Sequence, residues 1–442
     1  MAGVFDTLQA EIDAVQVMHR IGRVVAIGRG TVDVAGLSDV ATLGDLVKIG
    51  ENLGTPNMGE VLALSGDQIT VLPGESGAGL AIGDLVKLIG RNDLAPDRAW
   101  IGRVIDPFGR PLDGRPLLRG AQARPLRAAP PAAIGRRRMA GRLETGVAVF
   151  NTLLPLVRGQ RVGLFAGSGV GKSTLLSKFA RGVSADVVVI ALIGERGREV
   201  REFIESVLGP QGMARSVVVM ATSDQSPLLR RRCGLAAMTV AEHFRDQGLH
   251  VLLLADSITR FAEAHREVAL AAGERASLRG FPPSTTHQIM ALAERAGPGP
   301  ETGGGDITAV FTVLVAGSDM EEPVADTLRG VLDGHVVMDR AIAERGRYPA
   351  IDLLRSVSRS LPDAATADEN TLIQAARQML GAYDRSEMMI KAGLYVAGTD
   401  PLTDAAIAVW PALDHFLAED ETEDTTASFA RLAACLAGGV AG

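Results

Sequence analysis

The segment AGSGVGKST, residues 166–174, limits the possible folds of this chain more than any other part of the sequence. It lies between an apolar run predicted to be a strand, RVGLFAG, and a segment with helical spacing, KSTLLSKFARG. Its glycines let the backbone curve until several N–H groups point into one concavity, which binds phosphate oxygens. We therefore expect Lys172 to reach the β- and γ-phosphates of a nucleotide and the Ser173 hydroxyl to hold Mg²⁺. The residues expected to bind the nucleotide are Gly167, Ser168, Gly169, Val170, Gly171, Lys172, Ser173 and Thr174.

Apolar runs continue to alternate with helical segments beyond this loop. The runs VVVIALIG, SVVVMAT, HVLLLAD and ITAVFTVLVAG are predicted to be strands, and segments such as REVREFIESVLG separate them. Buried strands that alternate with helices form parallel sheets with helices on both faces. The sequence therefore predicts an α/β P-loop domain that binds a nucleotide.

Other patterns flank this domain. Short β runs such as IGRVVAIG and EVLALSGDQITVLP precede it, and the phrase GDLVK occurs twice, at 44–48 and 83–87. We interpret this part as a six-stranded β-barrel. The predicted division is 1–19 for an amphipathic N-terminal helix, 20–92 for the β-barrel, 93–362 for the P-loop domain with a Pro/Gly/Arg-rich connector at 107–142, and 363–442 for a C-terminal α-helical domain.

Composition excludes several classes of protein. With 442 residues the chain is too long for one core, and 47% hydrophobic with 22% charged residues is typical of globular proteins. A net charge of -7 and an aromatic content of 4% argue against nucleic acid as a partner. Cys233 and Cys435 lack the spacing of a metal site or a disulfide framework, and we find no apolar run that is long enough to span a membrane. We expect a cytoplasmic protein.

Two carboxylates are predicted at the carboxyl edge of the sheet, where α/β proteins bind ligands. Asp256 follows the run HVLLLA and is expected to orient Mg²⁺, with capping of the next helix as the alternative. Glu195 ends a strand that we expect beside the P-loop strand, and it can hold the attacking water in line with the γ-phosphate. Arg196 can balance the charge of Glu195 or contact the phosphate. Arg260 can face the phosphates or pair with Glu263 or Glu267. The remaining charges, at 198–202, are interpreted as a helix surface or a subunit contact.

Three polar segments have simpler interpretations. The triplet at 136–138, RRR, is interpreted as a solvated or phosphate-adjacent patch. The acidic segment EDETED at 419–424 is interpreted as a solvated turn. The loop GPGPETGGGD at 297–306 is expected to be mobile because of its glycines and prolines.

Four motifs, in this order, match a known family. GSGVGKST, LIGERGREVREF, LLLADSITRFAEAHREV and YPAIDLLRSVSR resemble the catalytic subunits of rotary ATPases, and among them most closely the flagellar and type III secretion export ATPases. The resemblance extends over nearly the whole chain. It implies a β-barrel, a RecA-like P-loop domain and a C-terminal helical domain, with ATP and Mg²⁺ as ligands.

The resemblance also implies roles for single residues. Lys172 and Ser173 match the phosphate and Mg²⁺ ligands, Asp256 matches the Walker B acid, and Glu195 matches the catalytic carboxylate. Arg359 follows the signature P-A-I-D-x-x-x-S-x-S and matches the arginine finger, which enters the active site of the neighbouring subunit in this family.

The aromatic residue of the same segment has an implied role as well. Tyr348 matches the residue that lines the adenine pocket of the family. An aromatic ring offers adenine a stacking face, which suits the role implied for Tyr348. A planar guanidinium neutralises the charge that spreads over a transferred phosphoryl group, which suits the role implied for Arg359.

The implied partners follow from the family. It implies a homohexamer, a helical regulator at the N-terminal segment 4–19, a coiled-coil stalk in the pore, export chaperone–substrate complexes, and an export gate at the cytoplasmic face of the inner membrane. The sequence supports the homohexamer because one chain carries both Glu195 and Arg359. The resemblance also implies that the loop at 297–306 corresponds to a segment that faces the pore, where we expect contact with a rotor or a substrate.

The sequence therefore predicts an ATPase that energises protein export and helps to release or unfold substrates. The residues of the segments FAGSGVGKSTLLSKFAR and GLYVAGTDPLTDAAI favour flagellar export; virulence-type secretion is the alternative. The catalytic subunit of an ATP synthase and an inactive ring subunit are less favoured, the latter because Glu195 is present. A helicase predicts an aromatic-rich N-terminal domain, whereas residues 1–90 contain one aromatic residue, Phe5.

Overall fold

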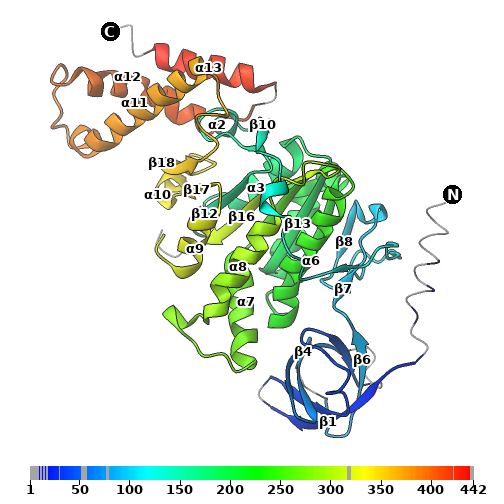
Figure 1. Cartoon of the computed structure of the whole chain (residues 1–442). Coiled ribbons are helices and arrows are strands. Elements are labelled where there is room, and N and C mark those ends of the chain that lie inside the picture. The colour runs from blue at the N-terminus through cyan, green and yellow to red at the C-terminus, as the bar shows by residue number, and fades with distance from the viewer. Residues whose placement is uncertain are drawn as a thin grey trace.

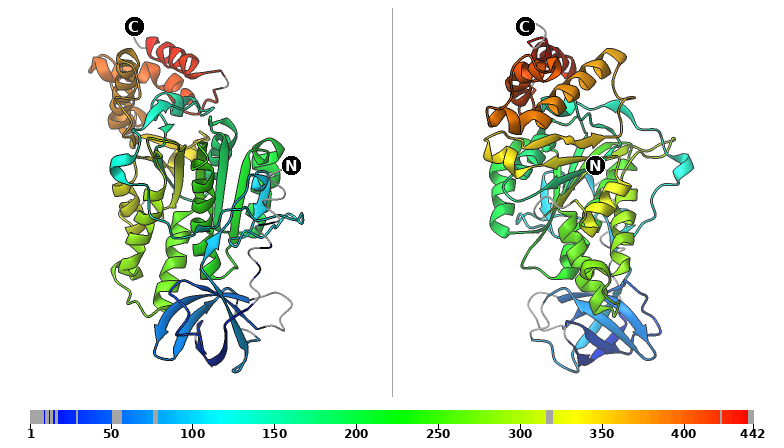
Figure 2. Two further views of the ribbon diagram at one scale, coloured as in Figure 1. Left: turned by 45° about the vertical axis from the view of Figure 1, so that its right-hand side comes forward. Right: turned by 90° about the vertical axis from the view of Figure 1, so that its left-hand side faces the viewer.

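Three parts follow one another in the computed structural model shown in Figure 1: a β-barrel, a central sheet covered by helices, and a group of C-terminal helices. The barrel and the C-terminal helices lie at opposite ends of the central part (Figure 2). The predicted N-terminal helix at 1–19 lies almost entirely outside the described residues. The structure describes residues 18–28, 30–50, 57–75, 79–315, 320–421 and 423–438, with the single positions 9, 12 and 15.

Six antiparallel strands close into the predicted barrel. Alternate side chains point inward and form an apolar core that includes Val34 and Ile69. The two GDLVK segments lie on neighbouring strands, where Lys48 lies opposite Lys87. In the order of their pairing the strands are β1 (Ile21–Ile27), β2 (Val32–Ala35), β5 (Gln68–Pro73), β4 (Asn57–Ser65), β3 (Leu46–Ile49) and β6 (Leu85–Gly90).

The central sheet has eight strands. They are parallel except for the last one, β18, which runs antiparallel to β17 at one border of the sheet. In spatial order the strands are β18 (Ile351–Ser358), β17 (Gly334–Met338), β12 (Arg161–Ala166), β16 (Asp306–Leu314), β15 (His250–Asp256), β13 (Val187–Glu195), β14 (Ser216–Thr222) and β8 (Arg103–Ile105).

This order corrects one prediction. We expected β13, which ends at Glu195, beside the P-loop strand β12, but β16 and β15 lie between them. Local apolar patterning identifies a buried parallel strand, but it carries no information about which strand lies next to it.

Helices cover both faces of the sheet and bury two apolar cores. Phe261 of α7 belongs to the core on one face, and Phe179 of α3 belongs to the core on the other. In the described residues, no helix is both long and apolar enough to cross a membrane. The helices of this part are α2 (Ala148–Asn151), α3 (Lys172–Gly182), α4 (Gly197–Glu202), α5 (Gly209–Met213), α6 (Pro227–Arg245), α7 (Ile258–Ala271), α8 (Pro283–Arg295), α9 (Pro323–Val331) and α10 (Arg340–Glu344).

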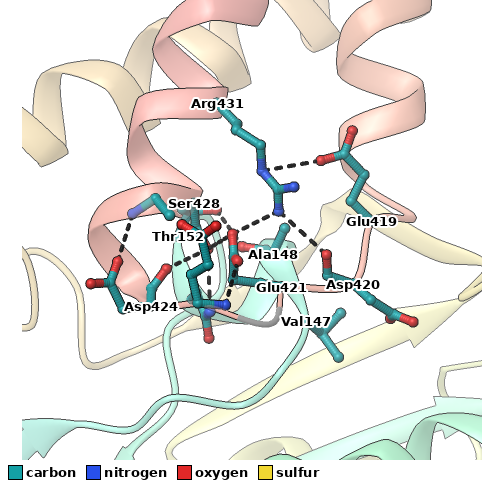
Figure 3. A network of polar contacts seen from close by, with 12 residues as sticks. Val147, Ala148, Thr152, Glu419, Asp420, Glu421, Asp424, Ser428 and Arg431 are labelled. Carbon is teal, nitrogen blue, oxygen red and sulfur yellow. Dashed lines mark hydrogen bonds and ion pairs between the residues drawn. The ribbon is translucent and has the colours of Figure 1, made fainter.

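The C-terminal part consists of α11 (Ala367–Lys391), α12 (Pro401–Phe416) and α13 (Thr425–Ala437). A polar network fastens α13 to α2 of the central part (Figure 3). Glu421 is 6% exposed and accepts hydrogen bonds from Arg431 at 2.6 Å and from Ser428 at 3.2 Å, and Ser428 also binds Asn151. The interpretation of EDETED as a solvated turn was therefore wrong for Glu421, whose charge is balanced inside the fold.

The arginine triplet of the connector also has a structural role that we did not predict. Arg136 donates to the carbonyl oxygen of Glu294 at 2.7 Å, and Arg137 donates to the carbonyl oxygen of Gly304 at 2.7 Å and to Asp306 at 2.8 Å. A guanidinium with five donors can satisfy several carbonyl groups of one loop. For these two arginines the interpretation as a solvated or phosphate-adjacent patch was wrong, because they hold the loop before β16.

Candidate active site

The P-loop leaves β12 and enters α3 through two glycines in the left-handed region. Gly169 has a φ of 80° and Gly171 a φ of 88°, values that residues with a Cβ rarely adopt. Val170 is buried between them and anchors the loop, whereas Ser168, Ser173 and Thr174 are exposed. The first N–H groups of α3, which lack partners within the helix, therefore lie at the open side of the loop.

The lysine of the loop lies between two carboxylates. Its Nζ atom is 2.5 Å from Oδ1 of Asp256, the last residue of β15, and 3.8 Å from Oε1 of Glu195. The side chains of Lys172 and Glu195 are 13% and 19% exposed, and that of Asp256 is 6% exposed. The structure thus brings together Lys172, Asp256 and Glu195, which were predicted from three separate motifs.

The register of the sheet explains how Glu195 reaches this place from a strand that does not border β12. Asp256 lies level with Leu192, so β13 continues three residues beyond the end of β15. The P-loop in turn rises above the carboxyl edge after Ala166, which is level with Leu314. Lys172 can therefore reach back over the intervening strand ends to both carboxylates.

Burial changes the acidity of Glu195. Removal from water, together with the charge of Asp256, raises its pKa to about 7, while Lys172 acts in the opposite direction. A carboxyl group with a pKa near neutrality is suited to proton transfer, because it can both accept and release a proton at physiological pH.

Arg196 does not face this cluster. Its guanidinium is 81% exposed and pairs with Glu199 one helical turn away, at 2.9 Å. The cation that lowers the pKa of Glu195 besides Lys172 is Arg260, which pairs with Glu263 at 2.8 Å. The expectation that Arg196 balances Glu195 is therefore not met in this structure.

Tyr348 lies against the P-loop. A methyl group built on Gly171 would lie 3.0 Å from Cδ1 of the tyrosine, so the ring packs directly on the turn that precedes α3. The tyrosine is 49% exposed, so part of its ring is open to a ligand at the loop. This position agrees with a ring that covers the base of a nucleotide.

Arg359 lies at the opposite edge of the sheet. It follows β18, whose last residue, Ser358, pairs with Gly334 at the start of β17. The P-loop follows β12 at the level of Met338, the last residue of β17. From Gly334 to Met338, β17 advances by four residues, or about 13 Å. Arg359 therefore lies about this far from the start of the P-loop along the strand direction and does not reach the P-loop of its own chain.

One residue near the site was missed in the sequence. Thr312 donates its hydroxyl hydrogen to Oδ1 of Asp256 at 2.7 Å and is fully buried in β16. A threonine inside the apolar run ITAVFTVLV was the available signal, because a buried hydroxyl needs a partner. Thr312 and Lys172 together fix the orientation of the Asp256 carboxylate.

Comparisons with known proteins agree with this geometry. Residues 146–358 match the nucleotide-binding domain of the ATP synthase alpha/beta family, and residues 365–434 match the T3SS EscN ATPase C-terminal domain. A flagellum-specific ATP synthase of Caulobacter vibrioides is 43% identical, over 95% of this chain and 96% of its own length. The chain belongs to the family of flagellar and type III export ATPases. A second member, the flagellum-specific ATP synthase of Salmonella typhimurium, is 45% identical over 81% of this chain and 80% of its own length.

Solved structures confirm the predicted fold of this export ATPase. The assembled ATPase EscN from the type III secretion system of enteropathogenic E. coli has a TM-score of 0.85 at 35% identity, covering 94% of this chain and 100% of that chain. EscN in complex with its central stalk EscO gives the same TM-score at 37% identity. The agreement over nearly the full length includes the barrel, the sheet and the C-terminal helices.

The residues of this export ATPase fit a magnesium ion bound together with a nucleotide. The Ser173 hydroxyl and the Asp256 carboxylate are oxygen donors, which Mg²⁺ prefers. No group of three or more His, Cys, Asp or Glu side chains in the described part of the chain could hold a metal ion on its own. Mg²⁺ that binds with a nucleotide takes one or two protein oxygens and completes its coordination with phosphates and water.

Proposed function

We propose that this chain hydrolyses ATP to energise the export of flagellar proteins through a type III apparatus. The observation that carries the proposal is the convergence of Lys172, Asp256 and Glu195 on the P-loop, in a chain whose relatives are flagellum-specific ATP synthases. The site holds both a cation for the phosphates and a carboxylate with a pKa near 7.

Each residue has a distinct task in the proposed reaction. The backbone N–H groups of residues 167–174 hold the phosphates, and Lys172 turns from Asp256 to the β- and γ-phosphates when ATP binds. Ser173 and Asp256 would hold Mg²⁺, which would supply positive charge to neutralise the phosphates. Glu195 accepts a proton from the water that attacks the γ-phosphate. As the water oxygen bonds to the γ-phosphorus, the bond from that phosphorus to the β,γ-bridging oxygen breaks, ADP and phosphate leave, and Glu195 releases the proton to solvent.

The proposed assembly is a homohexamer with active sites between subunits. Its support is the position of Arg359, which is too distant from the P-loop of its own chain to stabilise the transferred phosphoryl group there. EscN has been solved as an assembled ATPase and with a central stalk, EscO. By analogy we propose a coiled-coil stalk in the pore of this protein.

The remaining proposed partners follow from the role in export. They are a helical regulator at residues 4–19, chaperone–substrate complexes whose cargo is released or unfolded, and the export gate at the cytoplasmic face of the inner membrane. Nucleic acid is not among them, because a net charge of -7 disfavours binding to phosphate backbones.

The proposal is tested with Glu195→Gln in the source bacterium and in the purified protein. We expect ATP binding to persist, turnover to fall by ~10²–10⁴-fold, and secretion of flagellar filament protein to fall with it. The matched control is Glu344→Gln, because Glu344 is a surface carboxylate, 66% exposed, that pairs with Arg340. Unchanged turnover in the Glu195 variant would remove Glu195 from the mechanism, and unchanged flagellar secretion with lost turnover would remove flagellar export.

Virulence-type secretion is the second candidate, and two observations favour it. The C-terminal helices match the T3SS EscN ATPase C-terminal domain, and 94% of the chain superimposes on EscN. In the same strains, loss of secreted effector proteins with intact flagellar filaments would assign the chain to this class of cargo.

A further inference from the structure

Glu195 is positioned by a bulge in the strand that carries it. β13 pairs with β14 in register up to Ile193 and then slips, so that Glu195 lies opposite Thr222. Gly194, at the slip, has a φ of 69°, which favours glycine. Bulges of this kind re-aim a side chain next to a binding site. The bulge therefore sets the direction in which the Glu195 carboxylate leaves the sheet.

Two arginine side chains fill the space beside Gly194. A methyl group built on this glycine would lie 3.3 Å from Cβ of Arg260 and 3.4 Å from Cδ of Arg230. Arg260 belongs to α7, and Arg230 belongs to the first turn of α6. Helices that pack on one face of the sheet thus close over the bulge, which cannot move toward them without displacing an arginine.

The segment that follows β14 also holds the backbone of Glu195. The N–H group of Ser223 donates to the Glu195 carbonyl oxygen at 2.9 Å. The N–H group of Thr222 donates to Oε1 of Gln225 at 3.0 Å, which closes a tight turn over residues 222–225. The position of Glu195 therefore depends on the position of this turn.

Arg230 joins this turn to α7. Its Nε atom donates to the Gln225 carbonyl oxygen at 3.1 Å, and its Nη2 atom donates to Oε1 of Glu267 at 3.1 Å. The Arg230 side chain is 14% exposed, so water competes little for its bond to Gln225, whereas Glu267 is 44% exposed. A guanidinium can hold two acceptors at a fixed separation, which an ammonium group cannot do.

We infer that Arg230 is a positioning residue for Glu195: its guanidinium fixes the turn that holds the Glu195 backbone, and its stem supports the Gly194 bulge. The inference rests on the proposed function, in which Glu195 accepts the proton of the attacking water. Arg230 acts on Glu195 through position, because its charge is directed to Glu267.

The charged groups that act on the Glu195 carboxylate come from other elements. They are Asp256 of β15, Lys172 of α3, Glu199 of α4 and Arg260 of α7. Loss of Arg230 is therefore expected to misplace the carboxylate while it leaves the groups that hold the phosphates in place.

The test compares Arg230→Met, Arg230→Lys and the control Arg340→Met in the full-length assembled protein. Arg340 is a helix-surface arginine, 79% exposed, that pairs with Glu344 at 3.0 Å. We expect Arg230→Met to lower kcat by about 10²-fold, because a shift of about 1 Å at the reacting groups has an effect of this size. The Kd of a fluorescent ATP analogue is expected to stay unchanged, and Arg230→Lys, which keeps one of the two bonds, is expected to recover part of the rate.

Three results would overturn the inference: a kcat of Arg230→Met that stays near the wild-type value, a parallel loss of kcat and nucleotide affinity, or a lysine variant no better than the methionine variant. If Arg230→Met does not fold, Glu267→Gln decides, because Glu267 is 44% exposed and its loss removes one anchor of the guanidinium. Lower kcat with unchanged Kd then supports the inference, and unchanged kcat overturns it. Failure of the proposed function appears separately, as retained turnover in Glu195→Gln.

Discussion

Lys172 of the P-loop and the buried Asp256 of β15 form a largely buried ion pair, with Nζ and Oδ1 2.5 Å apart. The pair holds the lysine at the carboxyl edge of the sheet, where its charge is compensated before a nucleotide arrives. A buried charge whose partner is removed is strongly destabilised, so the lysine can leave the carboxylate only for another anion. We propose that the β- and γ-phosphates of ATP supply that anion, which would leave the carboxylate available to hold Mg²⁺.

Lys172→Ala is expected to weaken ATP binding. A hydrogen bond to a charged group contributes about 1.5–3 kcal/mol, which corresponds to a rise in Kd of roughly 10–150-fold. Titration with a fluorescent ATP analogue measures the effect. Lys178→Ala is the matched control, since Lys178 lies on the same helix and pairs with Asp420 away from the loop. Equal Kd values for the two variants would contradict the role of Lys172.

The parts of the site that could be predicted are those with a local signal. The strand–loop–helix context of residues 166–174 fixes the phosphate-binding loop, and Asp256 and Glu195 each end an apolar run. The carboxyl ends of parallel strands share one edge of a sheet, so their convergence could be predicted without knowledge of the strand order.

Contacts between distant segments could not be predicted in this way. The pairing of Arg137 with the carbonyl oxygen of Gly304, and that of Arg431 with the buried Glu421, join residues whose local sequence is also typical of a solvated surface. The sequence also could not show that Arg196 faces solvent, because the direction of this side chain depends on how its segment packs against the rest of the protein. Such choices depend on tertiary packing rather than on spacing.

The acidity of Glu195 predicts the pH dependence of hydrolysis. Because its pKa is raised to about 7, the carboxylate is mostly protonated below that pH and cannot accept the proton of water. The value of kcat/KM reports on the free enzyme, so it is expected to rise with pH through about 7 and to fall roughly tenfold per unit well below it. A profile that is flat from about pH 6 to pH 8 would show that Glu195 is not the base.

Tyr348→Ala is expected to weaken the binding of ATP, and the lost affinity is expected to come only from contacts with the adenine base. Loss of an aromatic stacking face costs about 1–3 kcal/mol per base, or roughly 5–150-fold in Kd. Tyr348→Phe keeps the ring and is expected to bind as the wild type does. Inorganic tripolyphosphate, which has no base, is the control ligand; an equal loss of affinity for tripolyphosphate would indicate that the tyrosine supports the loop at Gly171 instead.

Arg359→Ala is expected to lower turnover by ~10³-fold or more without loss of ATP binding, as for other arginine fingers. The register of β17 and β18 places Arg359 at the opposite edge of the sheet from the P-loop of its own chain, and we propose that its target lies in a second copy of the chain. Turnover per chain is therefore expected to climb steeply with protein concentration as the assembly forms.

Mixing two inactive variants separates action within a chain from action between chains. Arg359→Ala chains keep an intact P-loop, and Lys172→Ala chains keep the arginine, so a site formed between the two has every required group. We expect the mixture to regain part of the wild-type turnover, although each variant alone is inactive. If the mixture stays inactive although the two variants form mixed assemblies, Arg359 does not act across the interface. Because the distance along the sheet excludes action within one chain, its role would then be structural.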